Sequence, residues 1–411
     1  MRSTSCAVGT IRLEGVTPLP WDLARSAAHR AGADAARPPV EAPLSTTDGL
    51  TLARPLVALT DLPAFPTSSI DGWAVRGPQP WRIVGQVLAG SVAAPLASDG
   101  TCVEIATGAM VPDGTEHVLR VEESAVDGDL VTGTPRPSPE CRLPGEEASR
   151  GEELLPVGTP VTPGVIGLAA SCGYDVLAVR PAPRAAVLVF GDELLTAGAP
   201  GAGRVRDSLG PSVPLWLRRL GCVAGEPIGP VKDTLDAHVD AIRTALDDGA
   251  EVVCTTGGTM HGPVDHLHPA LAELGASYVV NTVAVRPGFP MLLAALPDGR
   301  FIAGLPGNPQ SAIVALMSLV APLIAGLQGR ALPALPSVTL GAPIPGRGSF
   351  THLALVRLVD GLAYPASHVG SSMLRGLARS AGFAMVGPGG NGDVGATVPL
   401  VPLPVLDGER P

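Results

Sequence analysis

A short apolar strand, a tight loop and a long apolar helix follow one another between residues 301 and 327, and this sequence restricts the fold of the chain more than any other. The loop, Gly304–Pro309, contains two glycines and two prolines. Proline fixes its own φ and disfavours a helical conformation in the preceding residue, whereas glycine permits close approach of another group. The pattern predicts a buried strand over Phe301–Leu305, a sharp turn, and a helix from Gln310 to about Leu327.

The first turn of this predicted helix contains Ser311, at a position where free N–H groups and the helix dipole favour an anion. The same pattern is also typical of a buried strand–helix corner without a ligand, and local chemistry does not separate the two. The helix contains Pro322 and is short for a membrane span, which favours a buried core helix.

A chain of 411 residues is long enough for two to four domains. Hydrophobic residues make up 45% and aromatic residues only 3%, so we expect cores packed from alanine, valine and leucine. The net charge of −10 argues against a nucleic-acid or membrane surface, but allows a small anionic ligand at a locally basic site. The six cysteines form no CxxC pair, which indicates a reduced, cytoplasmic chain.

Apolar runs and helices alternate between residues 183 and 330. The run at 185–190 is continuously apolar, which is typical of a parallel strand buried on both faces. The runs at 251–255 and 301–305 predict further strands of the same sheet. The helix predicted over Thr234–Asp248 has an apolar face made of Leu235, Val239, Ile242 and Leu246. The alternation predicts a doubly wound α/β domain at 183–330.

Short apolar runs separated by turn residues lie on either side of this domain. They predict a small inserted β domain over 61–139, formed as a barrel, and a C-terminal β domain over 332–411. The remaining residues, 15–60 and 140–182, are expected to form an N-terminal domain.

Two helices are predicted outside the α/β domain. One runs from Pro18 to about Ala36 and repeats Leu23, Ala27 and Ala31 on one face. The other is a short helical piece at Ser371–Arg379, within the C-terminal β domain.

Three loops follow buried strands of the α/β domain, and such loops gather at the carboxyl edge of the sheet, where open α/β sheets bind ligands. They are Gly191–Leu194, Thr255–Asp265 and Gly304–Pro309. Their glycines suit phosphates through backbone N–H groups, and the carboxylates of Asp192, Glu193 and Asp265 suit Mg²⁺. Each carboxylate alone is also explained by a helix cap or a solvated turn, so the prediction depends on convergence of the loops.

Two further loops offer polar groups. Ile105–Pro112 places Thr107 and a glycine after a strand, and Val283–Pro290 presents Arg286 on a Pro/Gly turn. Arginine has a planar fork that binds oxyanions, whereas the alternative for Arg286 is an ordinary surface charge.

Nine short segments carry a further pattern. They are Ser69–Arg76, Ile105–Ala109, Gly145–Glu147, Gly191–Leu194, Asp207–Ser208, Thr256–Asp265, Arg286–Gly288, Gly304–Pro309 and Gly370–Ser371. Taken in order, they resemble the molybdopterin molybdenumtransferases, the MoeA-type enzymes related to the E domain of gephyrin, and the resemblance extends from about Pro18 to Pro402. Each segment is a weak signal alone, but nine in order are specific.

The resemblance implies a multidomain α/β fold: a doubly wound, MogA-like domain with an elongated N-terminal region, an inserted small β domain and a C-terminal β domain. It implies a role in molybdenum cofactor biosynthesis, namely transfer of molybdate to the dithiolene of adenylylated molybdopterin with release of AMP, assisted by Mg²⁺. It also implies a homodimer, with the adenylyltransferase that supplies the substrate as a candidate partner, and no nucleic acid or membrane.

The same resemblance assigns roles to individual residues. Catalytic roles are implied for Asp71, Thr107, Glu193 and Asp265, with Asp71 and Thr107 reaching across to the partner subunit. Metal ligation is implied for Glu193, Asp233 and Asp265. Pterin and nucleotide contacts are implied for Gly257, Gly258, Arg286, Pro306, Gly307, Asn308, Ser311 and Ser371, the last on the molybdate side.

The chain departs from the family where an oxyanion pocket is expected. The family usually has Lys-Pro-Gly-Lys-Pro at Arg286–Pro290, so that Arg286 keeps the first charge and Phe289 removes the second. His352 stands where an arginine is usual. A charge-assisted contact contributes about 1.5–3 kcal/mol, so loss of two cations would weaken oxyanion binding by about 10²–10⁴-fold.

Two functions from different classes remain open. One is an active transferase. The other is a degenerate paralogue that binds molybdopterin or a nucleotide, or serves as a scaffold, without transfer; hydrolysis of the adenylylated pterin alone is a related third. Positive side chains turned toward the pocket, from Arg347, Arg357 or His368, would favour the enzyme, and an apolar, filled pocket would favour the paralogue.

Overall fold

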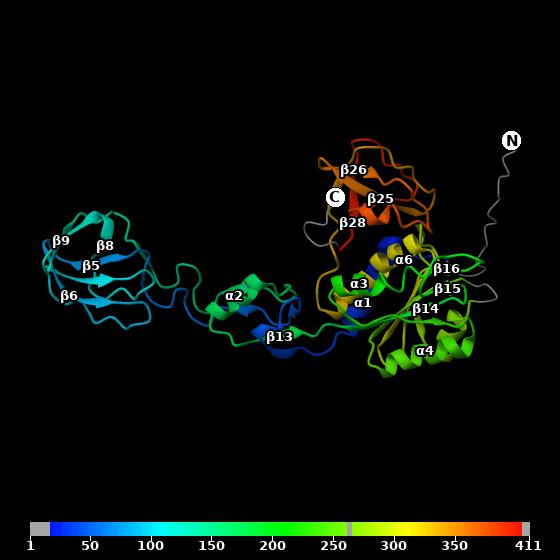
Figure 1. The fold of residues 1–411 in the computed structure, drawn as a ribbon, viewed down its shortest axis with the longest axis horizontal. Coiled ribbons are helices and arrows are strands. Elements are labelled where there is room, and N and C mark those ends of the chain that lie inside the picture. Colours follow the sequence, from blue (N-terminus) through cyan, green and yellow to red (C-terminus); the bar gives the residue numbers. More distant parts are fainter. Residues whose placement is uncertain (1–16, 261–264, 405–411) are drawn as a thin grey trace. The chain divides into compact units, whose positions relative to one another are not determined.

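The computed structural model describes residues 17–260 and 265–404, and the chain forms two compact units. The first unit comprises Met1–Val40 with Arg180–Pro411, and the second comprises Glu41–Val179. Figure 1 follows the chain in colour from its N-terminus to its C-terminus. The finer division into four domains stays a prediction.

A seven-stranded sheet forms the centre of the first unit. Its strands are, in spatial order, β17 (Val223–Ala224), β14 (Arg184–Phe190), β19 (Val252–Thr256), β23 (Phe301–Leu305), β22 (Leu292–Ala295) and β20 (Ser277–Asn281), with β18 (Ile228–Val231) also paired to β14. β14, β19 and β23 are parallel, whereas β22 is antiparallel to β23. Every residue of β19 and β23 is buried, as expected for strands covered on both faces.

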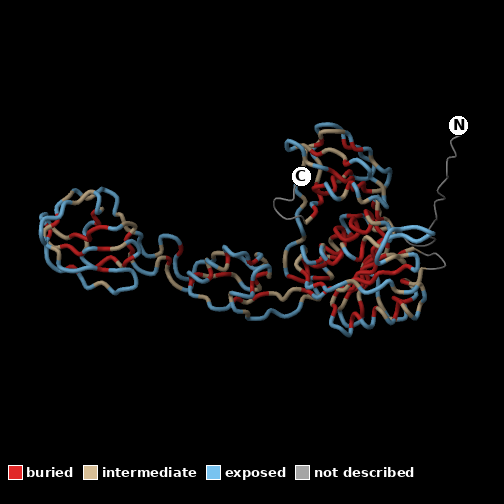
Figure 2. Tube along the Cα trace, viewed as in Figure 1, coloured by how far each residue is buried: buried red, intermediate tan, exposed pale blue. Residues whose placement is uncertain are grey.

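Helices cover both faces of this sheet (Figure 1). One face packs against α1 (Trp21–Asp34), α3 (Val213–Arg219) and α6 (Pro309–Ala315). The other packs against α4 (Leu235–Asp247) and α5 (Leu267–Glu273). The doubly wound α/β domain is therefore confirmed, and its sheet and helices contain a dense region of buried residues (Figure 2).

A continuous apolar helix, Pro309–Leu327, runs through the core of this unit. It comprises α6, a π-helical turn at Leu316–Val320, and α7 (Ala321–Leu327). The irregular turn lies next to Pro322, whose missing N–H cannot continue the regular ladder. The helix is long and apolar enough to cross a membrane, but its apolar stretch is entirely buried by protein, as expected for a core helix.

Helix α1 packs against α7 at very short range. A Cβ added to Gly32 would lie 2.2 Å from Leu323 O, and one added to Gly326 would lie 2.2 Å from His29 O. Only glycine fits at these two positions, so the two backbones approach more closely than larger side chains would allow.

The buried face of α1 differs from the predicted one. Leu23 is 52% exposed. The residues that α1 buries are Trp21, Ala24, Arg25, Ala28 and Gly32. The prediction from Leu23, Ala27 and Ala31 was wrong at Leu23, whereas Ala27 and Ala31 are partly buried against the core. The buried face is centred further toward Gly32, because α7 approaches the backbone of α1 there.

The C-terminal residues of the first unit form a closed five-stranded barrel. Its strands are β24 (Ser337–Leu340), β25 (Thr351–Val359), β26 (Leu362–Pro365), β27 (Gly382–Val386) and β28 (Thr397–Pro402), and a β25–β27 pairing closes the ring. Val356 and Ala384 belong to the core inside the barrel, whereas Leu355 and Phe383 belong to the core of the α/β domain. Alternate residues of the same strands therefore attach the barrel to the sheet domain.

The connection between β26 and β27 also differs from the prediction. The expected helix at Ser371–Arg379 is mostly turns, with one 3₁₀ segment at Leu377–Arg379. Gly376 closes this loop on itself, since an added Cβ would lie 3.0 Å from Ser367 O. The backbone is therefore held in turns by contacts within the loop.

The second unit contains a six-stranded sheet. Its strands are, in spatial order, β8 (His117–Arg120), β5 (Gly72–Arg76), β7 (Thr101–Ile105), β6 (Trp81–Val87), β10 (Leu130–Gly133) and β9 (Ser124–Asp127). The β domain is confirmed, but within this region the pairings leave β8 and β9 at the ends of a sheet where a barrel was predicted. Trp73 and Ala74, which are adjacent, belong to different cores, so both faces of this sheet are packed.

A smaller three-stranded sheet, β1 (Val40–Pro43), β13 (Val176–Arg180) and β2 (Thr51–Leu52), lies in the rest of this region. It shares a core with α2 (Pro163–Ser171). The Oγ1 atom of Thr162 caps α2 by accepting from Val165 N.

The contact between α1 and α7 should tolerate no added methyl group. Gly326→Ala is expected to lower the free energy of unfolding by about 1–3 kcal/mol, because the new Cβ overlaps His29 O. Denaturant unfolding followed by circular dichroism measures the change. Gly225→Ala is the matched control in the same unit, since its methyl group meets nothing within 4 Å. Equal stability of the two variants would contradict this account of the packing.

Candidate functional site

The loops that follow β14, β18, β19 and β23 converge at the carboxyl edge of the central sheet. Gly257 N donates to Leu305 O at 2.9 Å, which joins the loops after β19 and β23. Asp192 N donates to Asp233 Oδ2 at 3.2 Å, which joins those after β14 and β18. A Cβ on Gly307 would lie only 3.6 Å from Gly257 Cα. The predicted glycine-rich segments therefore meet, except for residues 261–264, which lie outside the described residues.

The glycines of this edge are required by backbone conformation. Gly257 has φ +90° and Gly258 has φ +69°, in a region that side chains with a Cβ rarely adopt. Gly191, after β14, has φ +138°. Tight turns of this kind expose backbone N–H groups at the end of a strand, which is the geometry that phosphates use in glycine-rich loops.

The three carboxylates predicted as metal ligands are held by different partners. Asp233 accepts from Asp192 N, and its Oδ1 lies 3.7 Å from His238 Nε2. The Glu193 carboxylate lies close to the backbone of Gly191 in the same loop: a Cβ added to Gly191 would lie 2.7 Å from Glu193 Oε2. The negative charge of Asp265 is close enough to His238 to favour the protonated form of the imidazole.

Within residues 17–260 and 265–404, no three His, Cys, Asp or Glu side chains are arranged to hold a metal ion. The residues present therefore do not fit a magnesium ion held by the protein alone. Mg²⁺ is commonly bound by one or two carboxylates together with substrate phosphates, and only that mode is compatible with this edge.

His238 is an unpredicted member of this region. It is completely buried on α4 and stacks on Phe190 with ring centroids 3.7 Å apart. Neither ring nitrogen has a hydrogen-bond partner in the described structure, and burial lowers its pKa. The apolar face of α4 includes its position, so periodicity could have predicted the burial, but not the contact with Asp233.

The start of the core helix is capped by another loop. The N–H groups of Gln310 and Ser311 donate to Ser371 O at 2.9 and 3.3 Å. Gln310 Oε1 accepts from Gly370 N at 3.4 Å. Ser311 and Ser371, predicted from distant segments, thus lie together, but these two N–H groups are occupied by a carbonyl and are not free for an anion.

Arg286 projects between two phenyl rings. Its Cζ lies 5.1 Å from the centre of the Phe289 ring and 4.7 Å from that of Phe350. The rings themselves meet edge to face at 5.7 Å. Phe289, which replaces a usual lysine, therefore holds an exposed arginine by cation–π contacts. The pairing of Phe350 with Arg286 was not predicted, because nothing in the local sequence connects the two.

His352 lies beside Arg286 in the paired strands β21 (Val285–Arg286) and β25. It is buried, and its Nδ1 donates to Pro345 O at 2.7 Å. Burial lowers its pKa, the hydrogen bond to Pro345 opposes this, and the positive charge of Arg347 adds to the lowering. The imidazole is therefore neutral at pH 7 and does not replace an arginine cation.

Asp71 and Thr107, predicted as catalytic, are in direct contact in the second unit. Asp71 Oδ1 accepts from Thr107 N at 2.7 Å and from Thr107 Oγ1 at 2.9 Å. These two hydrogen bonds lower the pKa of the Asp71 carboxyl. Both residues are exposed at one end of β5 and β7.

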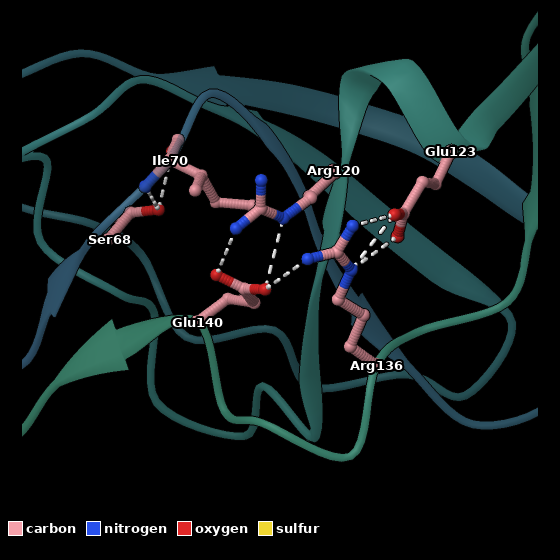
Figure 3. Close-up of polar contacts among 6 residues, drawn as sticks. All are labelled: Ser68, Ile70, Arg120, Glu123, Arg136 and Glu140. Atoms are coloured by element: carbon pink, nitrogen blue, oxygen red, sulfur yellow. Dashed lines mark hydrogen bonds and ion pairs between the residues drawn. The ribbon is translucent and has the colours of Figure 1, made fainter.

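A network of ion pairs braces the loop that contains Asp71 (Figure 3). Arg120 forms two hydrogen bonds of 3.0 Å with Glu140, whose backbone oxygen accepts from Ser69 N. Arg136 lies 3.8 Å from the same carboxylate and also pairs with Glu123. Bidentate pairing of this kind fixes geometry as well as charge. No motif in the sequence predicts it.

Family models match three consecutive parts of the chain. Residues 20–173 match "MoeA N-terminal region (domain I and II)", residues 186–326 match "Probable molybdopterin binding domain", and residues 337–403 match "MoeA C-terminal region (domain IV)". Together they define a protein with the multidomain MoeA architecture.

Curated relatives support the same assignment. A molybdopterin molybdenumtransferase of Staphylococcus aureus strain Mu50 is 31% identical over 301 residues, covering 70% of this chain and 71% of the relative. One of Haemophilus influenzae is 32% identical over 289 residues, covering 68% and 70%. The MoeA protein of Pyrococcus horikosii has a similar fold, with a TM-score of 0.76, 22% identity, and coverage of 94% of this chain and 99% of that one. The chain belongs to the molybdopterin molybdenumtransferase (MoeA) family.

His352 should make stability depend on pH. The unfolded imidazole takes up a proton near pH 6.5, whereas burial keeps its pKa lower in the folded state. The unfolded state therefore binds more protons below pH 6.5, and stability falls as the pH decreases. His352→Asn keeps a donor for Pro345 O but does not titrate. Urea unfolding at about pH 7.5 and 5.5 measures the free energy of unfolding, which should decrease less for the variant than for the wild type. Equal decreases in the two proteins would contradict a role of His352 in the pH dependence.

Proposed function

We propose that this chain is a molybdopterin molybdenumtransferase, which transfers molybdate to the dithiolene of adenylylated molybdopterin and releases AMP. Membership of the family supports a role in molybdenum cofactor biosynthesis. The observation that carries the proposal is the meeting of the glycine-rich loops at the carboxyl edge of the sheet. An edge of this kind is where open α/β sheets bind nucleotides and phosphates.

In this proposal the backbone N–H groups of Gly258, Gly307 and Asn308 hold the pyrophosphate of the substrate. Gly257 and Pro306 shape the two loops, because the Gly257 N–H already donates to Leu305 O and proline has no N–H. Mg²⁺ is a proposed cofactor, shared between substrate phosphates and the carboxylates near Asp233. Since the described residues form no complete metal site, no catalytic step is assigned to the ion.

Arg286 is the proposed molybdate contact. Its guanidinium is exposed and is fixed between Phe289 and Phe350, so a charged fork is available to an oxyanion. His352 supplies no charge beside Arg286, and the cation–π contacts with Phe289 and Phe350 keep the Arg286 guanidinium in place.

Asp71 and Thr107 are proposed to complete the site of a second copy in a homodimer. Their hydrogen-bonded, exposed arrangement is suited to that role, because Thr107 keeps the Asp71 carboxylate ionised. We further propose a cytoplasmic enzyme that receives its substrate from an adenylyltransferase. A paralogue without transferase activity is not favoured, since the relatives are transferases by name.

The decisive experiment measures AMP release from adenylylated molybdopterin by the full chain, with Mg²⁺, in the presence and absence of molybdate. Release that increases with molybdate supports transfer. AMP release that does not depend on molybdate indicates hydrolysis alone. Tight binding of adenylylated molybdopterin without AMP release indicates a binding protein.

Substitution of Arg286 tests the proposed oxyanion contact. Arg286→Ala should raise the molybdate concentration for half-maximal AMP release by about 10–150-fold, the equivalent of one charge-assisted contact. Arg286→Lys should recover part of the loss, because it keeps the charge but not the planar fork. Arg243→Ala, which removes an exposed pair with Glu273, is the control and should leave the dependence unchanged. An unaltered molybdate dependence in Arg286→Ala would remove Arg286 from the site.

A further inference from the structure

Three arginines surround one cavity at the edge of the C-terminal barrel. The cavity has a volume of about 290 Å³. It is lined by Arg357, Ala366, Ser367, Arg375, Gly376, Ala378 and Arg379. Three arginines and a serine therefore line this space, and no acidic residue is among its lining residues, in a chain whose net charge is −10.

These arginines differ in their pairing from Arg120 and Arg136. Arg120 and Arg136 also lie close together, but Glu140 and Glu123 lie between and beside them (Figure 3). Over the described residues, no carboxylate lies within 4.0 Å of Arg357, Arg375 or Arg379. Like charges gathered without a counter-charge repel one another, so an anion from solution would stabilise this arrangement.

The walls of the cavity are fixed by backbone contacts. Arg357 lies on β25, and the neighbouring Val356 O accepts from Ala381 N at 3.0 Å. Within the turn that contains Arg375 and Arg379, Ser380 Oγ donates to Gly376 O at 2.8 Å. The turn that contains Arg375 and Arg379 is thereby tied to the strand that contains Arg357, and the three side chains start from fixed positions.

One of the three side chains is also oriented. Arg375 Nη1 lies 3.1 Å from His368 Nε2. Arginine can only donate, so His368 Nε2 accepts this hydrogen bond. His368 therefore positions the guanidinium without neutralising it, and the remaining N–H groups of Arg375 stay available.

We propose that this cavity binds a tetrahedral oxyanion, either as the free ion or as the phosphate of a small monoester. Guanidinium groups match the oxygens of phosphate and related ions through paired N–H donors, and charge-assisted bonds of this kind are strong. The volume is close to the lower limit of small-molecule sites, about 300 Å³, so the cavity accommodates more than a lone ion. The proposal does not depend on the transferase activity.

Calorimetric titration of the full chain tests the proposal with inorganic phosphate, molybdate and AMP as probes. The variants are Arg357→Gln, Arg375→Gln and Arg379→Gln, singly and together, with Arg243→Gln as the control. Each single variant should weaken binding by about 10-fold or more, and the control should not. Arg375→Lys should recover part of the affinity, because it restores the charge without the fork.

The probes separate the two sources of the anion. If AMP shows the larger arginine-dependent affinity, the ligand is a phosphate monoester; if phosphate or molybdate equals AMP, it is the free ion. Both outcomes support the site. Affinities that are the same in the triple variant and the wild type, with circular dichroism showing both to be folded, would overturn it. Because Arg286→Ala leaves this cavity intact, arginine-dependent binding in that variant distinguishes this site from the proposed molybdate contact.

Discussion

The burial of one apolar helix, Pro309–Leu327, is the constraint on which the first unit depends. This helix shares a core with α1, the central sheet and the outer face of the barrel. Because glycines occupy the positions where α1 crosses α7, the two backbones pack closely and α1 shields the long helix from solvent. The rest of the unit is built around an element that could not remain exposed to water.

The same helix links the core to the candidate site. Its first turn is capped by Ser371 O, and the loop that contains Ser371 continues into the turn with Arg375 and Arg379. At the other side of the loop Gly304–Pro309, Gly257 bonds to Leu305. The barrel loop and the glycine-rich loops therefore both depend on one strand–helix corner, so packing in the core sets the geometry of the polar groups at the edge of the sheet.

Electrostatics differs among the arginines in ways that follow from their surroundings. Arg120 is neutralised by Glu140, and Arg286 is held by two aromatic rings. Over the described residues, the arginines around the barrel cavity have no carboxylate within 4.0 Å. In a chain with 38 acidic and 28 basic side chains, unpaired cations in a concave site are an arrangement that favours an anionic ligand.

The sequence by itself determined the alternation of strands and helices, because continuous apolar runs such as 301–305 are typical of strands buried on both faces. It also placed the glycine-rich turns, since backbone conformation at Gly257 and Gly258 is a local property. Only the tertiary structure decided the buried face of α1, the capping of Ser311 by Ser371 and the enclosure of Arg286 by Phe350. Those contacts join residues far apart in the chain, and their geometry depends on how closely the backbones pack, which local periodicity does not record.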